Sequence, residues 1–255
     1  MASKKSPTRV AVVTGAGSGV GRATVHQLAA QGWQVALLGR RADALKETIQ
    51  LAPAASRKQL TAFPCDVGDA AAFDAAAAAI LKKYGRVDVL VNGAGINIPK
   101  RALSVLSRED YRSVMAANID GSLFAVQAFL PGMRANGTGT IVNICSDAGI
   151  KVSAKAGAGY AISKFGMRAL TQAINEEERQ NGIRGVCICP GDINTPILDK
   201  RPVPPPAESR PLMLQAEDVA AAVLFAVTLH PRALIEELVI RPTRAYLPVS
   251  APQKP

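Results

Sequence analysis

Short apolar runs alternate with longer amphipathic stretches along the whole chain. The apolar runs predict strands at 10–14, 35–38, 60–64, 87–92, 140–144, 185–189 and 238–240. Strands that are apolar at every position are typical of a sheet covered on both faces. The longer stretches predict helices at 22–31, 42–51, 70–84, 109–133, 160–181 and 217–228. This alternation predicts an α/β fold with a doubly wound parallel sheet of about seven strands, in three layers α/β/α.

Length and composition favour one folded domain. The 255 residues are 48% hydrophobic and 20% charged, which is enough to build a sizeable core. No linker divides the chain, so residues 1–255 are predicted as a single domain. Within it we expect a flexible segment at 1–8, a proline-containing loop at 197–213 and an irregular tail at 247–255.

The net charge of +10 raises the question of a nucleic-acid partner. The basic residues are scattered and aromatic residues make up only 4%, so no stacking platform stands out and no nucleic acid is expected. A basic surface that suits anionic ligands is the favoured interpretation. No apolar stretch approaches the roughly 18–20 residues needed to span a bilayer. The N-terminus also lacks a signal-peptide core. We therefore expect a cytoplasmic protein with no membrane partner.

The four cysteines are Cys65, Cys145, Cys187 and Cys189, and their spacing contains no Cys-x-x-Cys pair. Cys187 and Cys189 alternate with apolar residues, which is typical of small buried positions in a strand. The sequence predicts reduced thiols, no disulfide framework and no metal site.

Ligands of doubly wound sheets bind beyond the carboxyl ends of the strands, so the residues there are the first candidates. After the first predicted strand, residues 14–21 read TGAGSGVG. Glycines let the backbone approach a pyrophosphate, and the N-terminus of the following helix attracts its charge. The alternative is an ordinary strand–helix turn. The position after the first of several alternating strands favours phosphate binding.

The second predicted strand is followed by Gly39, Arg40 and Arg41. An acidic residue in this region usually holds the ribose of NAD. Arginine instead offers planar contacts to a 2′-phosphate, so NADP is favoured over NAD. The alternative is that both arginines only solvate the start of a helix.

Polar or glycine-rich turns also follow the other strands. They contain Asp66 and Val67, then residues 92–95, then Ser146, then residues 190–196. Each could be ordinary turn chemistry. The Ser146 hydroxyl could also donate a hydrogen bond to a substrate oxygen.

Tyr160 and Lys164 are spaced by four residues in a predicted helix, which puts the ammonium near the phenol. A fixed cation lowers the pKa of a tyrosine towards the working range, so the pair could run acid–base chemistry on an alcohol or a carbonyl. The alternative is a surface pair beside a core stripe. Asn118 interrupts the long helical stretch and predicts a local kink.

Taken in order, these motifs resemble those of the short-chain dehydrogenase/reductase family, from Val10 to about Thr243. The resemblance implies a Rossmann-type fold, a nicotinamide cofactor and a catalytic set of Asn118, Ser146, Tyr160 and Lys164. Tyr160 would be the general acid or base, and Lys164 would lower its pKa and contact the nicotinamide ribose. Ser146 would orient the carbonyl, and Asn118 would hold a water that links Lys164 to solvent.

The resemblance also implies which residues surround the cofactor. Besides Tyr160 and Lys164, these expected contacts are Gly15, Ser18, Val20, Gly21, Asp66, Val67, Asn92, Ala94, Gly95, Pro190, Gly191, Ile193 and Thr195. Arg40 and Arg41, argued above, complete the expected set. The loop at 197–213 would cover the substrate, and an arginine in it could bind a carboxylate.

The expected function is reversible hydride transfer between NADP(H), with NAD(H) less favoured, and a small carbonyl or secondary alcohol. The C-terminal stretch 237–243 resembles reductases of small oxo or hydroxy acids. The alternative is a catalytically weak cofactor-binding regulator or scaffold with the same fold. A homodimer or homotetramer is expected from the family resemblance.

Overall fold

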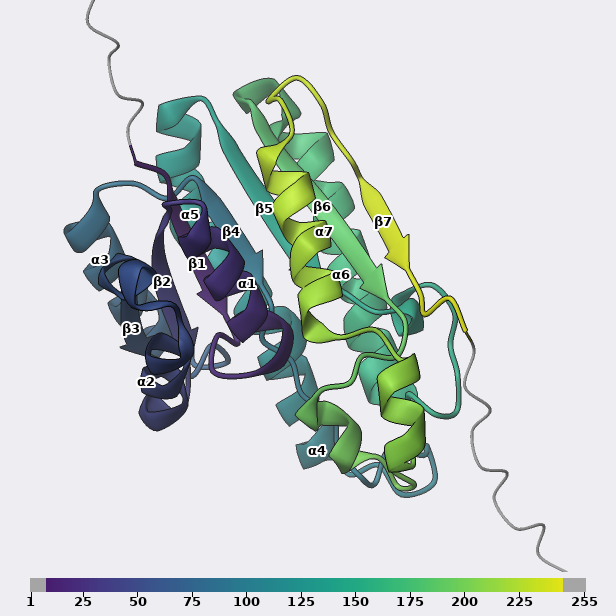
Figure 1. Cartoon of the computed structure of the whole chain (residues 1–255). Helices are drawn as coiled ribbons and strands as arrows, with labels where there is room; N and C mark the ends of the chain where they lie inside the picture. The colour runs from purple at the N-terminus through teal and green to yellow at the C-terminus, as the bar shows by residue number, and fades with distance from the viewer. Residues whose placement is uncertain (1–7, 245–255) are drawn as a thin grey trace, which may run out of the picture.

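In a computed structural model of the chain, which describes residues 8–244, seven parallel strands form one sheet in the order β3-β2-β1-β4-β5-β6-β7. The predicted tail at 247–255, and all but the last residue of the predicted segment 1–8, lie outside the described residues. The strands are β1 Val10–Thr14, β2 Gln34–Gly39, β3 Leu60–Pro64, β4 Val89–Asn92, β5 Gly139–Ile144, β6 Ile183–Pro190 and β7 Glu237–Ile240. The predicted doubly wound α/β fold is confirmed (Figure 1).

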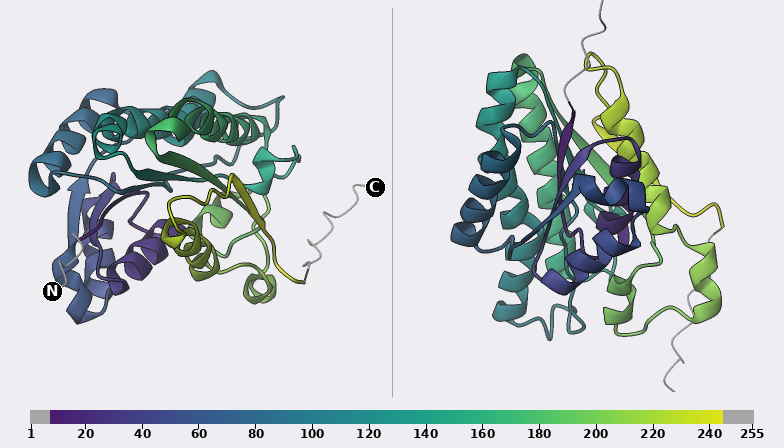
Figure 2. Two further views of the ribbon diagram at one scale, coloured as in Figure 1. Left: turned by 90° about the horizontal axis from the view of Figure 1, so that it is seen from above. Right: turned by 60° about the vertical axis from the view of Figure 1, so that its left-hand side comes forward.

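Helices cover both faces of the sheet, as Figure 2 shows from above. One face packs against α1, α2 and α7 through residues such as Leu28, Leu45 and Val223. The other packs against α3, α5 and α6 through residues such as Phe73 and Phe129. The helices are α1 Gly19–Ala30, α2 Ala42–Leu51, α3 Ala70–Tyr84, α4 Arg108–Met115, α5 Gly121–Asn136, α6 Ala158–Glu178 and α7 Ala216–Thr228. Alternate positions of each buried strand supply the two cores, which explains the unbroken apolar runs.

The topology places the ligand edge between β1 and β4. The chain moves from β1 outward to β3 and then returns to add β4 on the other side of β1. The loops after β1 and β4 therefore diverge and leave a crevice at their carboxyl ends. Short 3₁₀ turns flank this edge at Asp147–Gly149, Pro196–Lys200 and Ala207–Leu212, and two others lie at Ala54–Gln59 and Arg179–Asn181.

At Asn118, where the sequence predicts a kink, the structure has a π-helical segment, Ala116–Asp120, between α4 and α5. The Ser107 side chain caps α4 by accepting a hydrogen bond from the Asp110 backbone N–H at 3.0 Å. Asn118 is fully buried in the π segment, where its side chain bonds to the backbone of Ile96. The extra residue in this turn thus aims the Asn118 amide at the loop after β4.

The continuous helical stretch Arg108–Asn136 is long enough to cross a membrane and contains an 18-residue window with a mean hydropathy of 1.3. The prediction that no apolar stretch approaches this length is therefore wrong, because the window holds no more than two charged residues. The stretch packs within the helical layer, with Val114, Phe129 and Met133 buried against the rest of the fold. A core helix of a globular domain passes the same test.

Candidate active site

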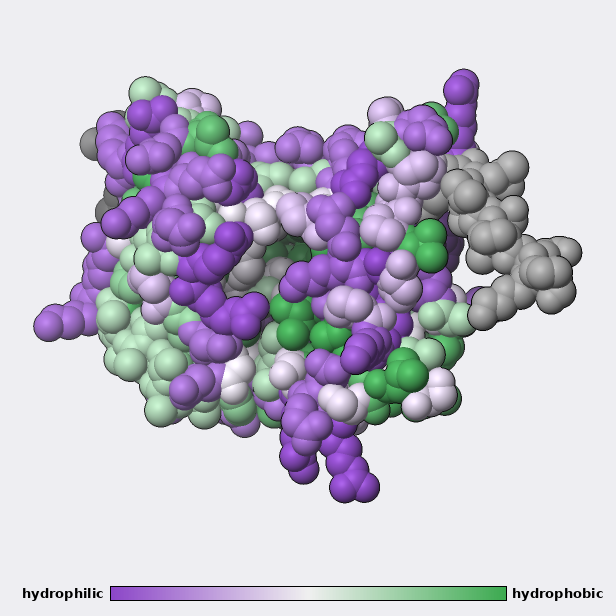
Figure 3. All heavy atoms as spheres, turned by 90° about the horizontal axis from the view of Figure 1, so that it is seen from below, coloured by the Kyte–Doolittle hydropathy of each residue, from purple (hydrophilic) through white to green (hydrophobic). Residues whose placement is uncertain are grey.

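A cavity of about 620 Å³ opens at the carboxyl edge of the sheet, and Figure 3 shows it as a hollow with a largely hydrophilic rim. Residues from the ends of β1, β4, β5 and β6 and from α6 meet in it. The predicted site residues that line it are Gly15, Ser18, Val20, Gly21, Gly95, Ser146, Tyr160, Lys164, Pro190, Gly191, Ile193 and Thr195. The structure therefore brings most of the predicted residues together around one hollow.

Seven predicted residues do not line the cavity, namely Arg40, Arg41, Asp66, Val67, Asn92, Ala94 and Asn118. Arg40 and Arg41 are exposed at the end of β2, and neither makes an ion pair within residues 8–244. The Asn92 side chain turns into the sheet, where it donates to Asn143 Oδ1 at 2.9 Å. A direct contact of the Asn92 side chain with a ligand in this cavity is not supported.

The loop after β1 is packed so closely that only glycine fits at two of its positions. A Cβ on Gly15, whose φ is +69°, would lie 2.6 Å from Gly93 O, and one on Gly21 would lie 2.3 Å from Gly15 O. The Thr14 hydroxyl holds the next loop by accepting from the N–H groups of Gly93 and Ala94, both at 3.1 Å. No side chain caps the N-terminus of α1, so its first N–H groups face the cavity edge at Ser18. This cradle fits a pyrophosphate.

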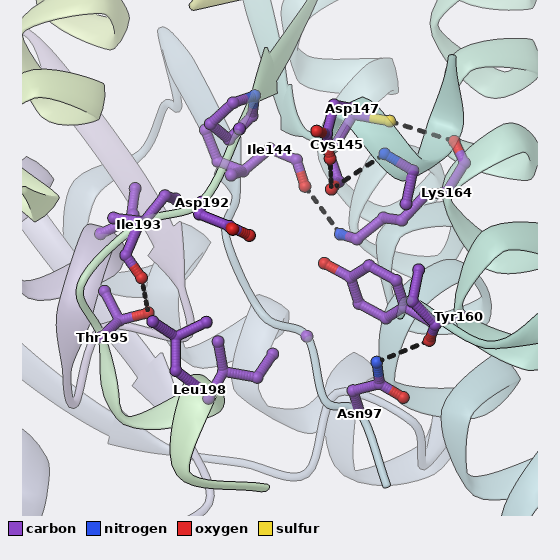
Figure 4. A pocket seen from close by; sticks show the side chains of 18 of the residues that line it. Asn97, Ile144, Cys145, Asp147, Tyr160, Lys164, Asp192, Ile193, Thr195 and Leu198 are labelled. Carbon is purple, nitrogen blue, oxygen red and sulfur yellow. Dashed lines mark hydrogen bonds between the residues drawn. The ribbon is translucent and has the colours of Figure 1, made fainter. Parts of the chain in front are cut away.

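Tyr160, in the first turn of α6, points its hydroxyl into the cavity (Figure 4). Burial raises its pKa to about 12, while a hydrogen bond with Ser146 and the charge of Arg201 act in the opposite direction. The predicted net lowering of this pKa is therefore wrong for the chain by itself. The physical reason is that burial penalises the phenolate more than its neighbours favour it. At neutral pH the Tyr160 phenol holds its proton.

Lys164 lies one turn further along α6, and its Nζ is 5.6 Å from the centroid of the Tyr160 ring. The ammonium donates to Ile144 O at 2.8 Å (Figure 4). It also lies 3.1 Å from Met167 Sδ. Only 3% of Lys164 is exposed, and burial lowers its pKa. The predicted proximity of ammonium and phenol is confirmed. The ammonium is nevertheless held by the end of β5 rather than by the tyrosine.

Asn118 lies behind Lys164 and fixes the loop after β4. Its Oδ1 accepts from Ile96 N at 2.7 Å, and its Nδ2 donates to Ile96 O and to Ser163 Oγ, both at 3.0 Å. A Cβ on Gly95 would lie 3.6 Å from both Asn118 Oδ1 and Lys164 Nζ. The Asn118 side chain thus joins the loop to the helix that carries Tyr160 and Lys164.

Charged residues gather at the outer part of the cavity. Asp192, after β6, pairs with Lys155 at 2.6 Å and with Arg201 at 2.5 Å. Arg101 is buried and donates to three backbone carbonyls, those of Ile98 at 2.7 Å, Lys155 at 3.2 Å and Lys200 at 2.6 Å. These contacts tie the segments around residues 98, 155 and 200 together over the cavity.

Sequence reasoning missed Arg101, Asp147 and Asp192 as lining residues. Asp192 could have been predicted from the sequence, because it lies in the turn after β6, which was predicted to face the ligand. Arg101 gave no signal, because a lone arginine in a loop is normally solvated. Its burial depends on carbonyls that lie 54 and 99 residues away along the chain.

Residues 9–203 match the short chain dehydrogenase family. The chain is 31% identical over 234 residues to an uncharacterized oxidoreductase of Staphylococcus haemolyticus, which covers 92% of this chain and 97% of that one. It is 37% identical over 196 residues to the 2-(R)-hydroxypropyl-CoM dehydrogenase of Xanthobacter autotrophicus, covering 76% and 78%. The closed form of a serine dehydrogenase complexed with NADP+ superposes with a TM-score of 0.84 at 26% identity, covering 96% of this chain and all of the other.

The glycine cradle, the cavity at the switch point and the family match agree. The chain belongs to the short-chain dehydrogenase/reductase family. It is an oxidoreductase that acts on an alcohol or a carbonyl.

Proposed function

We propose that the chain is an NADP(H)-dependent oxidoreductase that interconverts a small oxo acid and the matching hydroxy acid. The observation that carries the proposal is the convergence of Tyr160, Ser146 and Lys164 on one cavity, beside a cradle that fits a pyrophosphate. When bound, the nicotinamide supplies or accepts the hydride.

In the direction of reduction, Tyr160 donates its phenolic proton to the substrate oxygen as the carbonyl carbon gains a hydride. The raised pKa of Tyr160 keeps this proton in place at neutral pH, so the residue starts as an acid. The Ser146 hydroxyl hydrogen-bonds the same oxygen and stabilises the charge that develops on it. The resulting phenolate regains a proton from solvent. In the direction of oxidation Tyr160 must first lose its proton, which a high pH favours.

Lys164 and Asn118 act around this centre. The Lys164 ammonium, close to the Tyr160 ring, favours the phenolate that reduction leaves behind. Asn118 positions Lys164 by bonding the loop after β4 and Ser163 of α6. We further propose that a water near Asn118 links Lys164 to solvent.

The preference for NADP rests on the end of β2. Arg40 and Arg41 are exposed there and follow Gly39 directly, and the first acidic residue, Asp43, lies within α2. A Cβ on Gly17 would lie 3.0 Å from the Ala44 Cβ, so the glycine loop lies against the start of α2. The arginines are therefore beside the loop that would hold the pyrophosphate, where a 2′-phosphate would meet them.

The proposed preference for a substrate with a carboxylate rests on the charge around the outer cavity. Basic side chains outnumber acidic ones in the cavity lining, which contains Arg101, Lys151, Lys155, Lys164, Arg201 and Arg241 against Asp147 and Asp192. Asp192 pairs with both Lys155 and Arg201. Arg201 and Tyr160 line the same cavity, so Arg201 is near the proposed reaction centre. The serine dehydrogenase among the similar structures acts, by its name, on a hydroxylated amino acid. A carboxylate next to the reacting carbonyl would meet Arg201.

Oxidation of NADPH and of NADH, measured with a panel of small oxo acids and their methyl esters, tests the proposal. We expect NADPH to exceed NADH, and each acid to exceed its ester by about 10-fold or more in kcat/KM, since one charge-assisted hydrogen bond is lost in the ester. Equal rates for acid and ester would remove the acid preference. Tight NADPH binding with no turnover of any carbonyl or alcohol would favour a cofactor-binding regulator instead.

We also propose a homo-oligomer in the cytoplasm. The helices α5 and α6 present the exposed apolar residues Leu123, Ile162 and Phe165, which could meet a second copy. All four cysteines are free and buried, as suits a reducing compartment. Light scattering of the purified protein would reveal a monomer if the assembly proposal is wrong.

A further inference from the structure

Three of the four cysteines form a buried cluster beneath the active-site cavity. Cys145 follows β5, and its backbone N–H donates to Ile188 O of β6 at 2.8 Å. Cys187 and Cys189 flank Ile188 and therefore present their thiols on the same face of β6. The three Sγ atoms lie within 4.8 Å of one another, and those of Cys187 and Cys189 are 3.6 Å apart.

The thiol cluster lies among apolar and sulfur-containing side chains. Met167 of α6 packs in the same core cluster, and the partly buried Ile119 and Ile150 pack against it. Lys164 connects the thiol cluster to the active site through two contacts. Cys145 Sγ donates to Lys164 O at 3.1 Å (Figure 4). Met167 Sδ lies 3.1 Å from Lys164 Nζ. Thiols and thioethers are the ligands of soft cations.

The spacing of the thiols fits an ion at their centre. With metal–sulfur bonds of about 2.3 Å, ligating sulfurs lie about 3.8 Å apart in a tetrahedral site and about 4.0 Å apart in a trigonal one. The observed separations, 3.6 Å for one pair and at most 4.8 Å for the others, require shifts of less than an ångström. Cys145 also lines the active-site cavity, so an ion can reach the cluster from solvent through that cavity.

We propose that Cys145, Cys187 and Cys189 form a binding site for a soft d¹⁰ cation of the Cu(I) type, and that the bound ion inhibits the oxidoreductase. On binding, each ligating thiol releases its proton to solvent and becomes a thiolate. The three thiolates carry a charge of −3, of which a monovalent cation and the nearby Lys164 ammonium offset two, so the occupied site keeps one negative charge. No group is oxidised or reduced.

The contacts of Cys145 explain the inhibition. Turning Cys145 Sγ towards the ion breaks its hydrogen bond to Lys164 O, at the turn of α6 that carries the ammonium. Cys145 also directly precedes Ser146, so its movement displaces the hydroxyl that bonds to Tyr160. A ligand in the cavity would block access from solvent to Cys145 and so slow the uptake of the ion.

Titration of the reduced, cofactor-free protein with Cd²⁺ tests the site without reference to activity. Cadmium is a soft d¹⁰ probe whose thiolate complexes have an ultraviolet charge-transfer band. We expect one Cd²⁺ per chain, displaced by Cu(I) and unaffected by Mg²⁺. The variants Cys187→Ala and Cys189→Ala should each weaken binding by about 100-fold, since a thiolate is lost from the ion. Cys65→Ala is the matched control, because Cys65 is buried but lies after β3, away from the cluster.

Activity and uptake give the second part of the test. Binding of Cd²⁺ should inhibit the wild type in proportion to occupancy, and Cys187→Ala should keep its activity while it resists the ion. Preincubation with NADPH should slow the appearance of the charge-transfer band. Absence of the band, or an equal band in Cys187→Ala and the wild type, would overturn the metal site and show that the cysteines serve only as small buried residues. Occupancy without inhibition would overturn the proposed coupling to Lys164.

Discussion

Arg101 provides the sharpest test of how the cavity is held together. The variant Arg101→Met keeps most of the aliphatic volume and removes the guanidinium that bonds to Ile98 O, Lys155 O and Lys200 O. Hydrogen bonds of a charged group contribute about 1.5–3 kcal/mol each, so three of them set an upper bound of about 5–9 kcal/mol. Burial of the charge opposes this gain and lowers the pKa of Arg101, together with the charge of Arg201.

The net cost of Arg101→Met is smaller than this bound, because the loops that carry Lys155 and Lys200 lie at the cavity and their carbonyls can regain water. We expect a loss of about 2–4 kcal/mol in the free energy of unfolding. For a domain of this size, that loss corresponds to a fall in Tm of roughly 5–15 °C. The KM of the substrate should rise as well, because the segments that cover the cavity lose their common anchor.

Thermal unfolding followed by circular dichroism, together with urea unfolding, measures this loss. Arg112→Met is the matched control, since Arg112 is exposed on α4 and methionine has a similar helix propensity. The control should stay within about 0.5 kcal/mol of the wild type. If Arg101→Met is equally stable and its KM is unchanged, the guanidinium does not hold the three segments together.

Three further changes test other parts of the account. Arg40→Asp should weaken NADPH binding by about 10–100-fold in a fluorescence titration, through loss of a charge-assisted phosphate contact, while Lys46→Asp, the same charge change on α2, should have little effect. Gly21→Ala should lower the free energy of unfolding by about 1–3 kcal/mol, because its Cβ would lie 2.3 Å from Gly15 O. Gly132→Ala is the control and should raise the free energy of unfolding, because a Cβ there meets open space. Arg134→Ala should lower the free energy of unfolding, measured in urea at about pH 7, and should have a much smaller effect at about pH 3. The reason is that Arg134 lowers the pKa of the buried Glu178, so this contribution exists above the usual carboxyl pKa and is lost as the pH falls.

The fold could be predicted from the sequence because each of its elements has a local signature. The buried strands read as unbroken apolar runs, and α2 and α3 begin and end where the pattern predicted. The π segment at Asn118 had a local signal too, since asparagine is a poor helix former in the middle of a long helix. The helix predicted at 109–133 runs from Arg108 to Asn136, but its apolar 18-residue window was not recognised from the sequence.

The pKa shifts and ion pairs of the site could not be predicted from local sequence patterns. The spacing of Tyr160 and Lys164 predicted their proximity, but the raised pKa of Tyr160 follows from burial by segments distant in sequence. The cluster of Cys145 with Cys187 and Cys189 depends on the register of β5 against β6, which no local pattern encodes. The ion pairs of Asp192 likewise join three separate loops. Contacts of this kind require the three-dimensional structure.

The central claim is that Tyr160 is the proton-transfer residue of a reductase, and Tyr160→Phe tests it most directly. Removal of one oxygen leaves the ring packing intact, so the free energy of unfolding and the Kd of NADPH should stay close to those of the wild type. With the oxo acid that the wild type reduces fastest, the kcat of NADPH oxidation should fall by about 10²–10⁴-fold, the usual worth of a positioned general acid. A Tyr160→Phe variant that binds NADPH and reduces this acid at the wild-type rate would contradict the account.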